Sequence, residues 1–177
     1  MDDPLSSLSP DLSSPWLNAA GSLGYLPPAE WNWPQPMGAF VTPPLSYKAR
    51  TPAESRCALE YPGGCLLHSG LPNPGLRSAI KTYAVRWARL DAPVWVHLIA
   101  EDADEVAVMV RACEALENVM AVEIGLPPNG TPRECLELLD AASGELPLVA
   151  HITLERAAEN WLAELTRPGA GALRLVA

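Results

Sequence analysis

The sequence has 177 residues, 49% of them hydrophobic, and a formal net charge of −9 from 21 acidic and 12 basic side chains. A chain of this length and apolar content can bury the core of one domain. It holds no basic run and no apolar run near the ~20 residues of a membrane span, so we expect neither a nucleic-acid nor a membrane partner. The acidic start lacks a signal-peptide core, which predicts a cytoplasmic protein.

Prolines crowd the first part of the chain, which predicts short strands and turns there. Residues 13–20 and 38–42 are predicted strands, and 45–60 is a polar excursion in which a hairpin is one reading. Tyr61–Leu76 reads YPGGCLLHSGLPNPGL. Its glycines and prolines predict a shaped loop, neither helix nor strand, of the kind that meets ligands on a rigid scaffold.

After this loop the pattern becomes regular. A helix over 75–90, with Asn73 as its N-cap and Pro74 at its first position, precedes an apolar strand over 94–100. A second helix begins at Asp102.

The same unit repeats twice more. Residues 119–126 and 146–153 are predicted strands, separated by a helix that starts with the Thr131 capping box. A helix over 154–166 and a strand over 172–177 follow.

Alternating buried strands and helices at this spacing indicate βαβ units. A doubly wound sheet and a (β/α)8 barrel both fit. No G-x-G-x-x-G follows a strand, so we favour the barrel.

The four cysteines form no C-x-x-C, and the three histidines stand far apart in sequence. The sequence therefore predicts free thiols and no metal site.

Four segments in one order carry a family resemblance: NAAGSLGY (18–25), GAFVT (38–42), PGGCLLHSGLPNPG (62–75) and AVEIGLPPN (121–129). Together they resemble the dihydroorotate dehydrogenase family, FMN-dependent TIM-barrel oxidoreductases. The resemblance covers about residues 15–177.

The resemblance implies an α/β fold of the (β/α)8 TIM-barrel type, with residues 1–177 as a single FMN-type domain. Only about six βα units are present, so the chain reads as a fragment, the first three quarters of the barrel. A completing chain is the alternative, and a homodimer is a further expectation. Residues 43–70 would form a hairpin and glycine-loop excursion over the barrel mouth.

The family's chemistry is hydride transfer from a dihydropyrimidine, a small-molecule substrate, to FMN in pyrimidine biosynthesis. The enzyme class implied is a dehydrogenase acting on a CH–CH group. The cofactor-binding positions are Ala19, Ala20, Gly21, Thr42 and His151. The substrate-binding positions are His68, Gly70, Leu71, Asn73 and Asn129.

Several family residues are replaced. One lysine falls on Pro43, the amide that opens the glycine loop on Leu67 or His68, and the catalytic base on Pro127 or Pro128. The second lysine falls on His151, the predicted catalytic residue. These departures keep open a divergent homologue that is non-catalytic or acts on a different substrate.

Buried polar positions have alternative readings. His151 and His97 are each either site residues or core histidines bonded to a backbone carbonyl. Glu123, inside a buried strand, needs a partner. It is either a site residue or half of a structural pair with Arg174, and the pair is slightly favoured.

Overall fold

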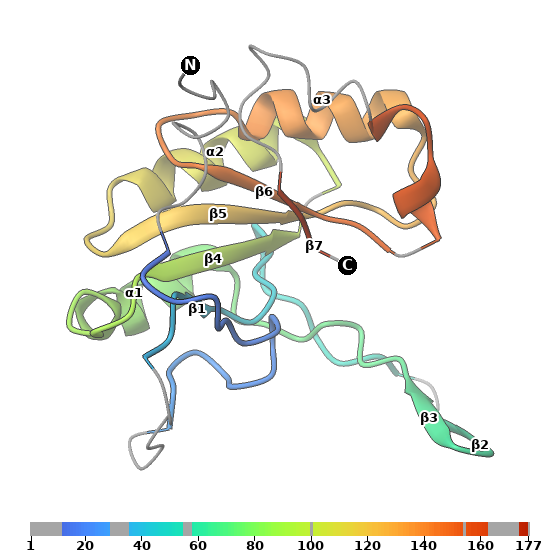
Figure 1. The fold of residues 1–177 in the computed structure, drawn as a ribbon, viewed down its shortest axis with the longest axis horizontal. Coiled ribbons are helices and arrows are strands. Elements are labelled where there is room, and N and C mark those ends of the chain that lie inside the picture. Colours follow the sequence, from blue (N-terminus) through green and yellow to red (C-terminus); the bar gives the residue numbers. More distant parts are fainter. Residues whose placement is uncertain are drawn as a thin grey trace.

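The computed structural model describes residues 12–28, 36–54, 58–99, 101–153, 155–162 and 174–176. It is a mixed α/β structure with a five-stranded parallel sheet (Figure 1). The sheet contains β1 (Phe40–Val41), β4 (Val94–Ile99), β5 (Val119–Gly125), β6 (Leu148–His151) and β7 (Arg174–Val176). The helices are α1 (Leu76–Trp87), α2 (Ala103–Glu114), α3 (Pro132–Ala142) and a 3-10 turn, η1 (Arg156–Ala158). The predicted strands after residue 37 and the first three predicted helices are confirmed.

The order of strands in the sheet bears on the choice between the two predicted architectures. The sheet runs β1-β4-β5-β6-β7, and each neighbouring pair is parallel. A doubly wound sheet reverses its strand order at a switch point, whereas a barrel wall keeps chain order. The observed order is consistent with part of a TIM-barrel-like fold.

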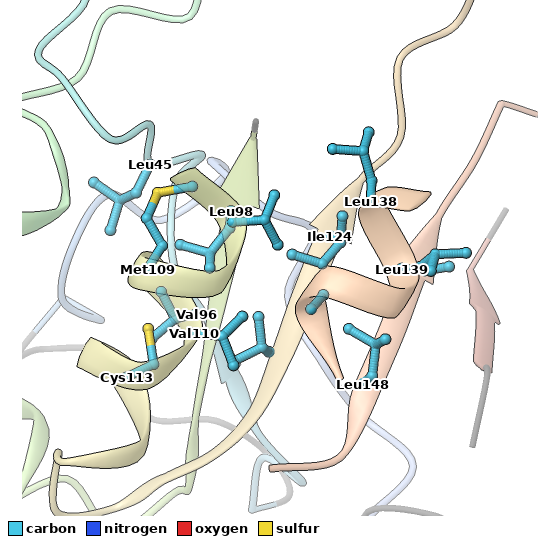
Figure 2. Packing of buried hydrophobic residues seen from close by; sticks show 14 of the residues in the cluster. Leu45, Val96, Leu98, Met109, Val110, Cys113, Ile124, Leu138, Leu139 and Leu148 are labelled. Atoms are coloured by element: carbon cyan, nitrogen blue, oxygen red, sulfur yellow. The ribbon is translucent and has the colours of Figure 1, made fainter. Parts of the chain in front are cut away.

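The two faces of the sheet bury different clusters. On one face, strand residues such as Val96, Leu98 and Ile124 pack against the apolar stripes of the helices (Figure 2). The opposite face holds a smaller cluster of Ala39, Val41, Trp95, Ala121 and Val149. Because side chains alternate along a strand, a residue two positions after Trp95, Ala121 or Val149 lies on the same face as this second cluster.

The helix N-termini largely follow the predicted caps. Asp102 Oδ1 accepts hydrogen bonds from the N–H groups of Asp104 and Glu105, and Thr131 forms the full capping box. The predicted cap of α1 is wrong. Gly75, with φ 78°, is the N-cap, because Asn73 Oδ1 accepts the Gly75 N–H within the preceding loop.

The strand predicted at 13–20 is also wrong. Among these residues the structure has a single parallel bridge, Leu17 to Ala39. The reason is the side-chain amide of Asn18. It accepts a hydrogen bond from the Val41 N–H and donates one to the Val41 C=O, each at 2.7 Å. A side chain thus supplies the hydrogen bonds that a neighbouring strand would have made.

The Tyr61–Leu76 stretch is not entirely loop, contrary to the prediction. Its first part forms a hairpin of β2 (Ala58–Tyr61) and β3 (Gly64–Leu67), which extends away from the sheet (Figure 1). Pro62 and Gly63 (φ 96°) make the turn, an arrangement typical of a type II turn. This tight turn leaves enough extended chain on each side to pair.

The predicted helix over 154–166 is only partly described. The structure shows η1 followed by the buried residues Trp161 and Leu162. Residue 154 and residues 163–173 lie outside the described part of the chain. Within the described ranges, no helix has the length and apolar character needed to cross a membrane.

Candidate functional site at the carboxyl ends of β4, β5 and β6

Three polar side chains from neighbouring strands meet at one edge of the sheet. His97 on β4 is the register partner of Glu123 on β5, and His151 on β6 is the partner of Gly125, two residues further along β5. All three lie on the face opposite the helices, in line with Trp95, Ala121 and Val149. They stand near the carboxyl ends of the strands, where ligand sites of parallel sheets are built.

The three side chains are in close contact. Nδ1 of His97 lies 2.6 Å from Oε1 of Glu123, and Nδ1 of His151 lies 3.6 Å from the same oxygen. The imidazole rings meet edge to face with centroids 5.4 Å apart. His97 and Glu123 are 2% and 5% exposed, whereas the His151 side chain is 47% exposed. Two members of the cluster, His97 and Glu123, are therefore buried, and the third, His151, is accessible.

Glu123 was predicted to need a partner, and its described partners are the two histidines. The slightly favoured partner, Arg174, has a side chain outside the described part of the structure. The prediction of no metal site overlooked this juxtaposition. His97 and His151 are 54 residues apart in number, yet β5 alone separates their strands.

A cleft of about 400 Å³ opens above the cluster. His97 and His151 line it, together with Ala20, Leu71 and Gly125. Its rim carries an ion pair between Arg50 and Glu101 at 3.1 Å. The cleft thus brings together the segment at Ala20, the glycine loop at Leu71 and the carboxyl ends of β4, β5 and β6.

The remaining predicted cofactor residues, Ala19, Gly21 and Thr42, do not line this cleft but contact or adjoin residues that do. Ala19 and Gly21 form the turn next to Ala20, in which Gly21 has φ 82° and the Ala19 carbonyl accepts the Ser22 N–H at 3.0 Å. Thr42 is fully buried, and its hydroxyl accepts the backbone N–H of His97 at 3.0 Å. Thr42 therefore fixes the strand that carries His97.

The glycine loop folds back on residues 46–53. Buried Asn73 accepts hydrogen bonds from Ser46 N and Ser46 Oγ and donates to the Leu71 carbonyl. Gly70 (φ 73°) lies so close to Ala53 that a Cβ would stand 2.9 Å from its nitrogen. These contacts turn the Asn73 amide into the loop and leave Leu71, 44% exposed with φ 50°, at the cleft.

The other predicted substrate residues lie away from the histidine cluster. His68 is exposed and is not among the residues that line the cleft. Asn129 lines a neighbouring depression of about 550 Å³, which shares Glu101, Pro127 and Pro128 with the cleft and also includes Glu134 and Glu137. Of the five predicted substrate positions, Leu71 is the one at the 400 Å³ cleft.

Arg156 is a buried residue that the sequence reasoning did not single out. Its guanidinium donates to the Pro127 carbonyl at 2.8 Å and forms a two-point ion pair with Glu159. The hydrogen bonds to Glu159 raise the pKa of Arg156, and the same bonds lower the pKa of Glu159. Arg156 thereby anchors the loop after β5 at the cleft wall; the i,i+3 spacing to Glu159 was the available signal.

No family model matches the chain. Three curated proteins do, each described as the catalytic subunit of dihydroorotate dehydrogenase B (NAD(+)). The protein from Desulforudis audaxviator is 29% identical over 119 residues, covering 65% of this chain. Those from Pelobacter propionicus and Trichlorobacter lovleyi are 29% and 28% identical over 66% and 65% of it.

The chain spans 38% of the length of each of these relatives. The chain is thus similar, at 28–29% identity, to catalytic subunits of the dihydroorotate dehydrogenase family.

Proposed function

We propose that this chain forms part of a dihydroorotate dehydrogenase-like flavin oxidoreductase of pyrimidine biosynthesis, with a dihydropyrimidine as substrate. One observation carries the proposal. Ala20, Leu71 and His151, assigned by the resemblance to flavin, substrate and catalysis, come from three distant segments and line the same cleft. A barrel closed by a further chain segment, a completing chain or a second copy belongs to this proposal.

The residues at the cleft fit a flat ring system such as that of FMN. The volume of about 400 Å³ falls in the range of small-molecule sites. Ala20 has a short side chain and Gly125 has none, so both leave space in the cleft. A Cβ on Gly125 would stand 3.1 Å from Nε2 of His97. We assign Ala20 and His151 to contacts with the flavin, Ala19 and Gly21 to the turn that presents Ala20, and buried Thr42 to holding the strand of His97. When bound, FMN would supply the hydride acceptor for this chemistry.

His151 is proposed as the group that removes the substrate proton. The family's base position falls on Pro127 or Pro128, which have no acid–base group. His151 is accessible from the cleft, and a neutral imidazole can accept a proton near neutral pH. With Nδ1 turned toward Glu123, Nε2 is the nitrogen left for the substrate.

The test is dihydroorotate-dependent reduction of a dye by the chain, expressed with any downstream continuation and supplied with FMN. We expect turnover in the wild type, at least about 100-fold less in His151→Ala, and unchanged turnover in Val85→Ala, whose residue is 67% exposed on α1. Equal turnover in the wild type and His151→Ala would refute the role of His151. Absence of turnover in a flavin-loaded wild type would refute the dihydroorotate activity.

A divergent homologue with a different substrate, or without catalysis, is the second candidate. The observation that favours it is the buried His97–Glu123 pair beneath His151, together with Pro43 and Pro127 at positions of family side chains. This candidate predicts ligand binding at the cleft without dihydroorotate oxidation.

A further inference from the structure

The cluster of His97, Glu123 and His151 has the donor set of a metal site. Each residue offers one ligand atom, and the three atoms lie within 4.8 Å of one another. Two imidazoles and one carboxylate are the protein ligands of many catalytic zinc sites and of other divalent first-row metals. The donors come from three adjacent strands, so their backbones are held by the sheet ladder.

Two of the three distances between ligand atoms require only small changes to admit an ion, and all three lie within 4.8 Å. Zinc bonds of ~2.0–2.1 Å in a tetrahedral arrangement place neighbouring ligand atoms roughly 3.3 Å apart. Glu123 Oε1 now lies 2.6 Å from His97 Nδ1 and 3.6 Å from His151 Nδ1. Opening the first distance and closing the second, each by less than 1 Å, is within reach of side-chain rotation.

The electrostatics of the cluster also favour a cation. A buried carboxylate such as Glu123, 5% exposed, needs a positive partner. Arg50, at the rim, is paired with Glu101. Among the described residues, the partners of Glu123 are His97 and His151, and two imidazoles facing one carboxylate suit a metal ion.

We propose that His97, Glu123 and His151 bind one divalent transition-metal cation of the zinc class on the floor of the cleft. Because His151 is accessible, the ion keeps a coordination position open to the cleft, as in catalytic rather than structural sites. A substrate oxygen or water would take that position. The site is an alternative to the proposed role of His151 as base, because an imidazole that binds a metal through Nδ1 carries its proton on Nε2.

The test is calorimetric titration of the chelator-treated, flavin-free chain with Zn²⁺. We expect one equivalent to bind, with affinity at least about tenfold lower in Glu123→Gln and His151→Ala. Cys65→Ser, which removes an exposed potential ligand, is a matched control and should bind as the wild type does. Circular dichroism of each variant checks folding, and half-exposed His151 can be removed with the least disturbance.

Two results would overturn the proposal: no Zn²⁺ bound by the folded wild type, or equal affinity in the wild type, Glu123→Gln and His151→Ala. Titration with Mg²⁺ serves as a further contrast, since oxygen-preferring Mg²⁺ should not bind a two-imidazole site; equally tight Mg²⁺ binding would also count against it. A chain that binds Zn²⁺ but no FMN would uphold this inference and refute the flavin proposal. A chain that binds FMN but no Zn²⁺ would refute this inference and uphold the flavin proposal.

Discussion

Nδ1 of His97 lies 2.6 Å from Oε1 of Glu123, with both side chains buried between β4 and β5. Removing His97 leaves Glu123 with the more distant His151, 3.6 Å away, and breaking a buried pair typically costs about 3–5 kcal/mol. His97→Ala is therefore expected to lower the free energy of unfolding by that amount in urea denaturation. The double variant His97→Leu/Glu123→Leu should recover part of the loss, and a double variant no more stable than His97→Ala would contradict the pairing.

Arg156 should stabilise the loop after β5. Arg156→Ala removes the donor to the Pro127 carbonyl and the partner of Glu159, for an expected loss of about 1.5–3 kcal/mol. Arg133→Ala is the control, because Arg133 pairs with Glu137 at the exposed surface and should cost much less. Equal losses in the two variants would show that Arg156 acts as an ordinary surface arginine.

The capping box of α3 should make stability depend on pH. Hydrogen bonds from the Thr131 backbone and hydroxyl lower the pKa of Glu134 from its ordinary value of 4.5. The folded state thus favours the charged form, so the stabilisation is present above pH 4.5 and lost as the pH falls through the lowered pKa. We expect the stability gap between the wild type and Glu134→Gln to close on acidification; a gap independent of pH would refute this.

The described cysteines should differ in reactivity. Burial, with a smaller effect from the charge of Glu114, raises the pKa of Cys113 to about 12, whereas Cys65 is exposed on β3. Since the thiolate is the reactive form, an alkylating reagent at pH 8 should label Cys65 first and Cys113 only after unfolding. Peptide mapping by mass spectrometry measures this order. Labelling of both at similar rates would contradict the packing of α2.

The regular elements were predictable because each carried its own local signal. The box of Thr131 and Glu134 identified α3, and the apolar runs identified β4, β5 and β6. The errors arose where distant side chains replaced backbone contacts. Asn18 satisfies Val41 in place of a strand.

The site was harder to predict than the fold. His97 and Glu123 lie in strands with apolar residues on both faces, so no alternation showed which face each residue joins. Their meeting depends on strand register, which local sequence does not specify. His151 was identified only through its place at a strand end and the family resemblance.

The central claim is that the cleft above the histidine cluster binds flavin. Its direct test is a titration of FMN with the chain, monitored by flavin fluorescence. The proteins compared are the wild type, Ala20→Phe and Ala115→Phe. Ala20 lines the cleft, whereas exposed Ala115 caps α2 at the opposite edge of the sheet. We predict saturable binding that Ala20→Phe weakens at least about tenfold and Ala115→Phe leaves unchanged. Absence of binding, or equal affinity in all three proteins, would contradict the claim.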